Sequence, residues 1–460
     1  MTTAALPLRS SATQSDRPTF FQQFFWSVLL SLYFFAIYGI ANTVTAHRAA
    51  LGRHIPTFVF DFERHIPFVP AMILPYMSID LFFFAAPFFC ATIPQLRTHA
   101  KRILLAITIA GTIFLLFPLR YAFVRPHPSG LCSPLFDLLY AYDHPYNLAP
   151  SLHIVNCSIL WLIYIPRTVP RFRWPVRVWF LLIGLSTLLV YQHHLIDILI
   201  GQILAMLCFY LLPSPAPAPG HDGYSGSIRS DSIKNLRVAL LYSLLTLALV
   251  ALACFLPRPG VLLLWPAFAT GMVAAGYWGL GPIVFPKTNG QLTLTTRWLL
   301  FPYFAVARLF HLHNMRRAKE PYVQVAPNVL LGRRLSEHEA ARAVQQQRIT
   351  AVLDLTAEFS EPRAFRELAY CNIPILDLTA PTSDQLTAAV SFIRDHARSG
   401  KVYVHCALGY SRAACIVAAY LVSEKLADSP ADAAGRLAKL RPIILRSRAR
   451  AALDQFCATC

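Results

Sequence analysis

A histidine–cysteine pair followed by an arginine is the feature of this sequence that most directly indicates chemistry. Residues 401–422 read KVYVHCALGYSRAACIVAAYLV, in which five residues separate Cys406 from Arg412. The apolar run predicts a strand, and the stretch after the arginine predicts a helix. A tight loop that leads into a helix turns backbone N–H groups inward and makes a cradle for an anion. The positive field at the helix N-terminus also stabilises a thiolate.

These properties indicate an attack on phosphate. Cys406 would be the nucleophile at phosphorus, and Arg412 would hold two phosphate oxygens in a bidentate fork. Gly409 can adopt the backbone angles that such a loop needs. A thiolate requires a reducing compartment, so we expect this site on the cytoplasmic side. The loop residues expected to bind the phosphate are Ala407, Leu408, Gly409, Tyr410 and Ser411.

The segment from about 320 to 457 resembles the dual-specificity branch of the protein tyrosine phosphatase superfamily. The resemblance rests on the pattern HCxxGxxR, and on PNVLLGRRLSEHEA and AVLDLTAE, which are similar to strands of that family. It implies a cysteinyl-phosphate intermediate, with no cofactor and no metal. It also implies a general acid on a loop about thirty residues before Cys406. Asp377 fits best, Asp384 is the second choice, and Asp354 is the third.

Two features of this segment bear on its activity. Where the family usually places Ser or Thr after the arginine, this chain has Ala413, which predicts slower hydrolysis of the intermediate unless Ser411 or water substitutes. The loop also lacks the Lys that phosphatases of polyphosphorylated inositol lipids often carry. A singly phosphorylated substrate is therefore favoured. Membrane attachment favours a lipid phosphate, and a phosphoprotein or a phosphosugar stays open.

A second constellation lies in the N-terminal half of the chain. It comprises Arg125 in FPLRYAFVRP, Ser151 and His153 in LAPSLH, and His193 and Asp197 in STLLVYQHHLID. The spacing of His193 and Asp197 would place them on one helix face, where the carboxylate fixes the imidazole tautomer and frees the other nitrogen to attack phosphorus. His153 would protonate the leaving oxygen, and Arg125 would neutralise the phosphoryl charge.

These three segments, within about 25–212, resemble the signatures of the membrane type 2 phosphatidic acid phosphatase superfamily. Those signatures are K-x6-R-P, P-S-G-H and S-R-x5-H-x3-D. The chain departs from them at Pro118, Leu152 and Thr187, so two of the expected phosphate-binding cations are missing. The pattern is more similar to the branch that contains inositol phosphorylceramide synthases. That branch implies transfer of a phospho-headgroup between lipids, and the resemblance implies that Arg125 and Ser151 contact the substrate.

Composition indicates what kind of molecule carries these two sites. The chain has 460 residues and a formal net charge of +18, yet only 14% of its residues are charged while 56% are hydrophobic. Too few charges are present to coat one soluble globule, and the hydrophobic content excludes general disorder. Uncharged stretches long enough to cross a bilayer recur along the chain. We predict eight spans, at 22–42, 68–92, 102–119, 152–166, 177–192, 195–212, 238–256 and 261–285.

Basic residues in the loops predict the orientation of these spans. The loops after the second, fourth and eighth spans carry Lys and Arg without acidic residues, which places them, with both chain termini, in the cytoplasm. The His193 site would then face outward. The basic excess is thus explained by membrane topology, and no nucleic-acid motif accompanies it. Scarce Lys beside abundant Arg, Ala and Leu favours a bacterial inner membrane.

The predicted fold is a polytopic α-helical membrane protein with a C-terminal cytoplasmic α/β domain, because strand-like and helix-like segments alternate near the C-terminus. The predicted regions are a six-span unit at 1–212, a Pro/Gly/Ser linker at 213–236, two further spans at 237–286, a basic and aromatic interfacial segment at 287–317, and the α/β domain at 318–460.

The resulting hypothesis is an integral membrane phosphatase with two sites, one on each side of the bilayer, that acts on lipid phosphates. The first alternative is a lipid phosphotransferase with an accessory phosphatase domain. The second is a membrane receptor or scaffold in which one domain has lost catalysis, as Ala413 and the missing cations would allow. The sequence predicts no oligomeric state and no coupling between the sites.

Overall fold

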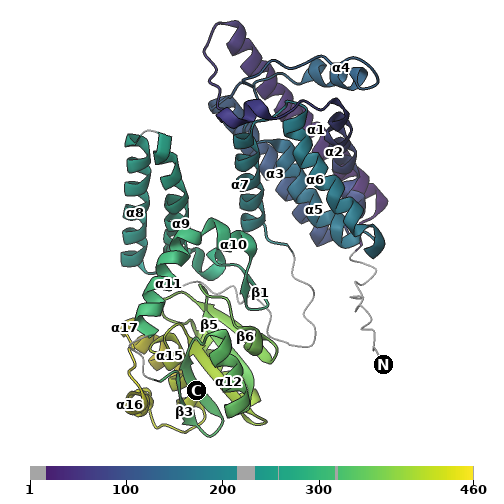
Figure 1. Cartoon of the computed structure of the whole chain (residues 1–460). Coiled ribbons are helices and arrows are strands. Elements are labelled where there is room, and N and C mark those ends of the chain that lie inside the picture. Colours follow the sequence, from purple (N-terminus) through teal and green to yellow (C-terminus); the bar gives the residue numbers. More distant parts are fainter. Residues whose placement is uncertain (1–16, 215–233, 257, 316–319, 459–460) are drawn as a thin grey trace. The chain divides into compact units, whose positions relative to one another are not determined.

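The computed structural model describes residues 17–214, 234–256, 258–315 and 320–458. The chain forms two compact units, Met1–Pro217 and Ala218–Cys460 (Figure 1). Most of the predicted linker at 213–236 lies outside the described residues.

The first unit is a bundle of apolar helices, and a hydroxyl group caps the start of three of them. The side chains of Thr19, Thr92 and Ser151 each accept a backbone N–H in the first turn of the helix that follows. Gly111 allows close helix packing, because a Cβ there would lie 2.4 Å from Ile37. The helices are α1 (Phe20–Ala50), α2 (Ile73–Ala85), α3 (Ile93–Leu116), α4 (Ser133–Tyr142), α5 (Leu152–Arg167), α6 (Arg173–Leu189) and α7 (Leu195–Leu211).

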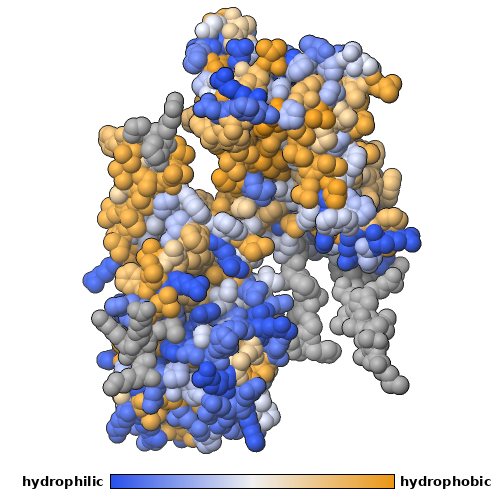
Figure 2. Space-filling view, viewed as in Figure 1, coloured by the Kyte–Doolittle hydropathy of each residue, from blue (hydrophilic) through white to orange (hydrophobic). Residues whose placement is uncertain are grey.

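Several helices have the length and composition of membrane spans. Within the described ranges, six helices are long and apolar enough to cross a bilayer, at Phe20–Ala50, Pro70–Phe89, Ile93–Leu116, Pro170–Leu189, Leu236–Phe255 and Gly260–Val284. Two further predicted spans form shorter apolar helices, α5 and α7, of 16 and 17 residues. Figure 2 shows hydrophobic side chains over the helices of the first unit and over α8 and α9. The chain therefore has a membrane region, and the count of eight spans stays a prediction.

The described part of the second unit opens with a helical hairpin. Helix α8 (Leu236–Phe255) packs beside α9 (Leu264–Ala275), where Thr246 and Thr270 join their hydroxyl groups at 2.9 Å (Figure 1). After α9 the chain forms a π-helical turn at Gly276–Leu280 and a 3-10 turn at Gly281–Val284. Gly279 within the first turn has φ 145°, which an L side chain rarely adopts. The helix is thus interrupted where the predicted span at 261–285 contains Gly and Pro.

The predicted interfacial segment contains four short elements. They are the β-hairpin β1 (Lys287–Thr288) and β2 (Gln291–Leu292), then α10 (Leu294–Leu299) and α11 (Phe301–Met315). The hairpin is bound to the following domain, because Lys287 Nζ donates to Asp354 Oδ2 at 3.0 Å. Leu309 and Phe310 of α11 are largely exposed, in keeping with an apolar surface on this helix.

The α/β domain is built on one five-stranded sheet with the strand order β3-β4-β7-β5-β6. Neighbouring strands are parallel except for β3, which pairs antiparallel with β4. The apolar runs in RITAVLDLT, CNIPILDL and KVYVHC contribute to β5, β6 and β7, and the strand predicted before the Cys406 loop is thus confirmed as β7. The strands are β3 (Tyr322–Ala326), β4 (Val329–Arg333), β5 (Ile349–Thr356), β6 (Ala369–Ile375) and β7 (Lys401–Cys406).

Helices cover both faces of this sheet. Alternate strand residues point to opposite faces, so Val329 and Leu331 pack with α14 and α15, while Leu330 packs with α12. Because the strands are parallel, their carboxyl ends meet at one edge, where the loops after β5, β6 and β7 emerge. The helices are α12 (Glu337–Gln347), α13 (Arg363–Arg366), α14 (Ser383–Ala397), α15 (Arg412–Ser423), α16 (Pro430–Leu440) and α17 (Ser447–Cys457).

Candidate active sites

The loop between β7 and α15 forms the predicted anion cradle. Cys406 ends the strand, is 3% exposed, and accepts the Gly409 N–H on its sulfur at 3.3 Å. Gly409 has φ 73°, and a Cβ at this position would lie 2.5 Å from the carbonyl oxygen of Gly332. Both the backbone angle and the close approach of β4 therefore require glycine here.

The carbonyl groups of the cradle are held from outside the loop. Arg334 N–H donates to the carbonyls of Cys406 at 2.9 Å and Ala407 at 3.2 Å. Arg441 Nη2 donates to the Leu408 carbonyl at 3.2 Å, and a backbone N–H donates to the Tyr410 carbonyl. In a trans peptide the C=O and the following N–H point in opposite directions. This anchoring therefore turns the N–H groups of residues 407, 408, 409 and 411 away from those outside donors, as an anion cradle requires.

Arg412 is held by a glutamate that the sequence analysis did not single out. Its guanidinium donates to Glu358 Oε1 at 2.8 Å and Oε2 at 3.1 Å, and to the Ile375 carbonyl at 2.8 Å. Burial raises the pKa of Glu358, but the charge and hydrogen bonds of Arg412 together hold it below its ordinary value. Glu358 follows β5 and Ile375 ends β6, so two neighbouring strands orient one guanidinium.

The three predicted general-acid candidates lie in different surroundings. Asp377 Oδ1 is 3.3 Å from Arg412 Nη2, and its side chain is 55% exposed, so it lies beside the cradle and reaches solvent. Asp384 lies in the exposed first turn of α14. Asp354 is fully buried in an ion pair with Lys287. Asp377 is thus the candidate whose carboxylate contacts a residue of the phosphate-binding motif.

Behind Cys406 lies a buried charged cluster. Donor atoms of Asp354, Glu361 and His405 lie within 4.8 Å of one another, a grouping that could hold a metal ion. Lys287 Nζ, 3.0 Å from Asp354, already places a cation on this cluster. Burial lowers the pKa of His405 to about 4 despite the opposing charge of Asp354, so this imidazole is neutral at pH 7. His405 Nε2 lies 4.0 Å from Asp354 Oδ1, so the cluster lies between β5 and the end of β7, directly before Cys406.

The second constellation lies at one end of α5 and α7 in the first unit. His193 Nδ1 is 3.5 Å from Asp197 Oδ2, and the ring centroids of His153 and His193 are 6.1 Å apart. The shared helix face that we predicted for His193 and Asp197 is wrong, because α7 begins only at Leu195. His193 instead lies in the turn before the helix, and Asp197 in the first helical turn reaches back to it.

Close packing of two helices brings these residues together. A Cβ on Gly201 of α7 would lie 2.7 Å from the carbonyl oxygen of Ser151, the residue that caps α5. The Ser151 N–H also donates to the Asp197 carbonyl at 3.0 Å. These contacts fix the start of α5, which carries His153, against the start of α7.

Two other residues of the first unit have clear partners. His194, beside the predicted nucleophile, accepts the Ala122 N–H on Nε2 at 3.0 Å, so its Nδ1 carries the proton toward Glu63 Oε2 at 3.1 Å. Arg125 donates to the Asp143 carbonyl at 2.8 Å and lies 3.7 Å from its carboxylate. The pair of His194 and Glu63 thus holds the residue next to His193 in place, and the guanidinium of Arg125 is already paired with Asp143.

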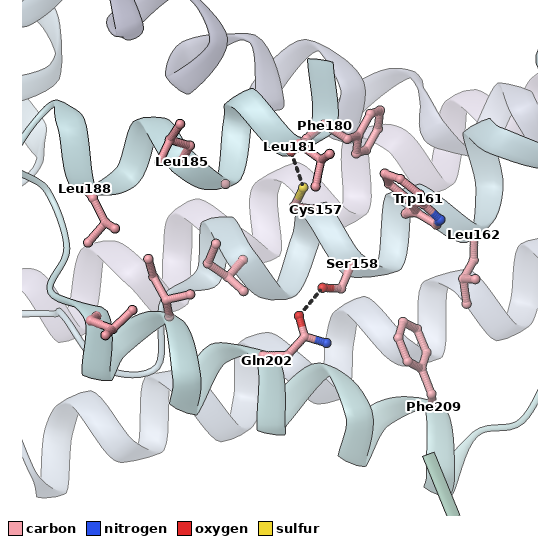
Figure 3. Close-up of a pocket in the computed structure, with 14 residues that line it drawn as sticks. Cys157, Ser158, Trp161, Leu162, Phe180, Leu181, Leu185, Leu188, Gln202 and Phe209 are labelled. Atoms are coloured by element: carbon pink, nitrogen blue, oxygen red, sulfur yellow. Dashed lines mark hydrogen bonds between the residues drawn. The ribbon is translucent and has the colours of Figure 1, made fainter. Parts of the chain in front are cut away.

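A lateral groove of about 590 Å³ runs between α5, α6 and α7 (Figure 3). Its lining is mostly apolar and includes Trp161, Leu181 and Phe209. Two polar side chains of its wall bond to each other, because the Ser158 hydroxyl donates to Gln202 Oε1 at 3.0 Å. The groove includes Ile154 and Leu195, which are close neighbours in sequence of His153 and His193.

Comparisons with known proteins concern the second unit. The family described as dual specificity phosphatase, catalytic domain, matches residues 334–453. A human protein named phosphatidylglycerophosphatase and protein-tyrosine phosphatase 1 is 30% identical over 150 residues, which cover 29% of this chain and 74% of the relative. The chain belongs to the dual specificity phosphatase family.

Solved structures also match this domain. A crystal structure of PTPMT1 in complex with PI(5)P is 25% identical, with a TM-score of 0.28, and the match covers 30% of this chain and 96% of that one. The crystal structure of Tk-PTP in its active form is 21% identical, with a TM-score of 0.29, and the match covers 31% and 99% of the two chains. Family membership makes the chain a phosphatase, an enzyme that hydrolyses phosphate monoesters.

The matched range of the phosphatase domain contains Cys406, Arg412 and Asp377, and also Glu358. Glu358 is one of several acidic residues near the end of β5, and nothing in its local spacing separates it from Glu361. Its role emerges only from the contact with Arg412, 54 residues later. The sequence offers one general indicator of such a residue, because a buried arginine needs a carboxylate partner.

Proposed function

We propose that the phosphatase domain removes the phosphate group from a lipid phosphate monoester at the membrane surface. The main support for this proposal is the cradle, in which the Gly409 N–H donates to the Cys406 sulfur beside Arg412. The same unit also contains the apolar hairpin α8–α9. Such a hairpin keeps the cradle near the headgroups of a bilayer.

The mechanism we propose has two steps. The Cys406 thiolate attacks phosphorus, the P–O bond to the leaving alcohol breaks, and Asp377 gives that oxygen its proton. Water then attacks the cysteinyl-phosphate, Asp377 takes the proton from this water, and the thiolate leaves with release of inorganic phosphate. Arg412 and the loop N–H groups stabilise the charge on the phosphoryl oxygens in both steps.

The proposed substrate follows from the cradle and from the named relative. The described loop residues 407–411 carry no cationic side chain, which suits a phosphate group without further phosphates beside it. The human relative, 30% identical, is named as a phosphatidylglycerophosphatase. We therefore propose a singly phosphorylated lipid such as phosphatidylglycerophosphate, and a phosphotyrosine protein is the competing substrate.

The test uses the full chain reconstituted in lipid nanodiscs. Every protein in this test carries His193→Ala, which removes the second proposed site. Phosphate release is measured from phosphatidylglycerophosphate and from a phosphotyrosine peptide, with Cys406 intact, with Cys406→Ser and with Cys415→Ser. We expect hydrolysis of the lipid to exceed that of the peptide and to vanish in Cys406→Ser. Cys415 is buried in α15 and serves as the matched cysteine control. A preference for the peptide would reject the lipid assignment, and activity of Cys406→Ser would reject the nucleophile.

A second candidate function concerns the first unit, and the contact of His193 with Asp197 favours it. We propose that His193 attacks the phosphorus of a lipid at the outer membrane face, with His153 as the proton donor. The groove between α5, α6 and α7 would accept an acyl chain beside these histidines. Water as acceptor gives a phosphatase, and a lipid alcohol gives a phosphotransferase. We also propose that the protein lies in a bacterial inner membrane with both chain termini in the cytoplasm.

A further inference from the structure

The loop that carries Asp377 is bound to the membrane hairpin by two hydrogen bonds. Tyr277, in the π-helical turn after α9, donates its hydroxyl to the Asp377 carbonyl at 3.0 Å. Asn235, which precedes α8, donates its side-chain Nδ2 to the Leu378 carbonyl at 2.8 Å. The side chain of Leu376 also approaches Gly276, where a Cβ would lie 3.6 Å from Leu376 Cδ1.

The loop needs such external support. Leu378 has φ 60°, a left-handed conformation that is unfavourable for a residue with a branched side chain. The two carbonyls bound by the hairpin are those on either side of this residue, at Asp377 and at Leu378 itself. Fixing both peptide groups fixes the backbone angles of Leu378. The direction of the Asp377 side chain depends on the same backbone.

The two donors are themselves held in place. The Asn235 N–H donates to the Tyr277 carbonyl at 3.2 Å, and Asn235 Oδ1 caps α8 by accepting the Val238 N–H at 3.4 Å. Tyr277 is 6% exposed, and its ring stacks on Tyr242 with centroids 6.2 Å apart. The hairpin therefore presents a fixed pair of donors to the Asp377 loop.

We propose that Tyr277 and Asn235 are positioning residues that align Asp377 with the leaving group, so that the membrane hairpin forms part of the catalytic apparatus of the phosphatase domain. This inference rests on the proposed role of Asp377 as general acid. Tyr277 and Asn235 act through the backbone of the acid loop and touch neither the phosphate nor the leaving group. A small displacement of a proton donor is costly, because proton transfer depends on hydrogen-bond distance.

The test compares two substrates with different needs for a proton donor. Phenyl phosphate releases a poor leaving group that depends on the general acid, whereas p-nitrophenyl phosphate releases a good leaving group that depends on it little. The full chain in nanodiscs is assayed as Tyr277→Phe and as Asn235→Asp, which keeps an oxygen to cap α8 but removes the donor. Trp278→Phe is the matched control, because it removes an indole bond to Ser243 in the same hairpin.

We expect Tyr277→Phe and Asn235→Asp to lower kcat for phenyl phosphate about tenfold, with a change below about threefold for p-nitrophenyl phosphate. Trp278→Phe should behave as wild type. In an Asp377→Asn background, Tyr277→Phe should cause no further loss, because both changes remove the same function.

Equal losses on both substrates, or a further loss in the Asp377→Asn background, would overturn the positioning role. Cys406→Ser is assayed in the same experiment and separates this outcome from failure of the proposed function. If Cys406→Ser hydrolyses either substrate like wild type, the cysteine mechanism itself is rejected. If Cys406→Ser is inactive and the two hairpin variants match Trp278→Phe, only the positioning role is rejected.

Discussion

Glu358 and Arg412 form a two-point ion pair inside the phosphatase domain, with N–O distances of 2.8 and 3.1 Å and side-chain exposures of 7% and 2%. The pair fixes the plane of the guanidinium before any phosphate is bound. A planar, fixed guanidinium is the geometry needed for two-point binding of phosphate oxygens. The pairing thus leaves Arg412 with an oriented guanidinium beside the cradle.

The first prediction concerns this pair. Glu358→Ala leaves a buried charge without its partner, which should cost about 3–5 kcal/mol of stability and lower kcat/KM at least tenfold. Glu358→Gln, which keeps one acceptor, should lose less of both. Urea unfolding and steady-state kinetics measure the two effects. Glu367→Gln is the control, because its partner Arg363 is 76% exposed and such surface pairs contribute little to stability.

The second prediction separates the acid candidates. Asp377→Asn should reduce kcat for phenyl phosphate by about 10²–10⁴-fold, because the leaving oxygen loses its proton donor. Asp384→Asn should stay within about threefold of wild type, since Asp384 is exposed in the first turn of α14. The reverse order in the measured rates would move the general acid to Asp384.

The third prediction concerns the tight turn of the cradle. Gly409→Ala places a Cβ 2.5 Å from the Gly332 carbonyl oxygen at φ 73°, and backbone atoms cannot move away as a flexible side chain can. We expect loss of at least about 90% of the phosphatase activity and a lower melting temperature. Gly435→Ala in α16 is the matched control, where a Cβ meets nothing within 4 Å. That change should stabilise the domain by up to about 1 kcal/mol.

The fourth prediction is a pH dependence of stability. Burial holds the pKa of His405 at about 4, whereas an unfolded histidine titrates near 6.5. The unfolded chain therefore binds a proton at a pH where the folded domain does not. The resulting stability is complete above about pH 6.5 and is lost as the pH falls toward 4, by about 3 kcal/mol in total. Hydrogen exchange of β7 as a function of pH measures this slope.

A His405→Gln variant should lose that slope while keeping the fold of β7. An unchanged slope in this variant would assign the effect to another group. Asp354, whose pKa is lowered to about 2 by Lys287 and His405 against the effect of burial, contributes only below about pH 4.

The sequence sufficed for features that are encoded locally. Strand β7, the loop and helix α15 follow from a run of apolar residues and the spacing between Cys406 and Arg412. The apolar stretches likewise placed the helices, because a long uncharged segment has few other stable structures.

Features that join distant segments could not be predicted in this way. Glu358 and Arg412 are 54 residues apart, and Tyr277 and Asp377 are 100 apart, so no local pattern relates them. The error at His193 has a related cause. The i, i+4 spacing was interpreted as a helix face, but Asp197 accepts the His194 N–H at 2.7 Å, which makes His194 the N-cap, so α7 begins at Leu195 and does not include His193.

The fifth prediction concerns the first unit and is made in a Cys406→Ser background, which silences the phosphatase domain. With a lipid phosphate supplied on the outer side of proteoliposomes, His193→Ala should abolish the remaining activity. Asp197→Asn should reduce it about a thousandfold, because the imidazole loses the carboxylate that orients it. His144→Ala, an exposed loop histidine, should change nothing.

The products then distinguish the two chemistries. Free phosphate indicates hydrolysis, and a new phospholipid formed from an added lipid alcohol indicates transfer. The Lys and Arg side chains of the superfamily signatures are replaced in this chain by Pro118 and Thr187, and Arg125 is paired with Asp143. A site with so little positive charge holds a phosphodiester more readily than a monoester. With a phosphodiester lipid as donor in the same proteoliposomes, we therefore expect transfer of the phospho-headgroup to the added alcohol to be faster than phosphate release from the lipid phosphate. If activity in the Cys406→Ser background survives His193→Ala, the histidine is not the nucleophile, and the first unit serves the phosphatase domain only as its anchor.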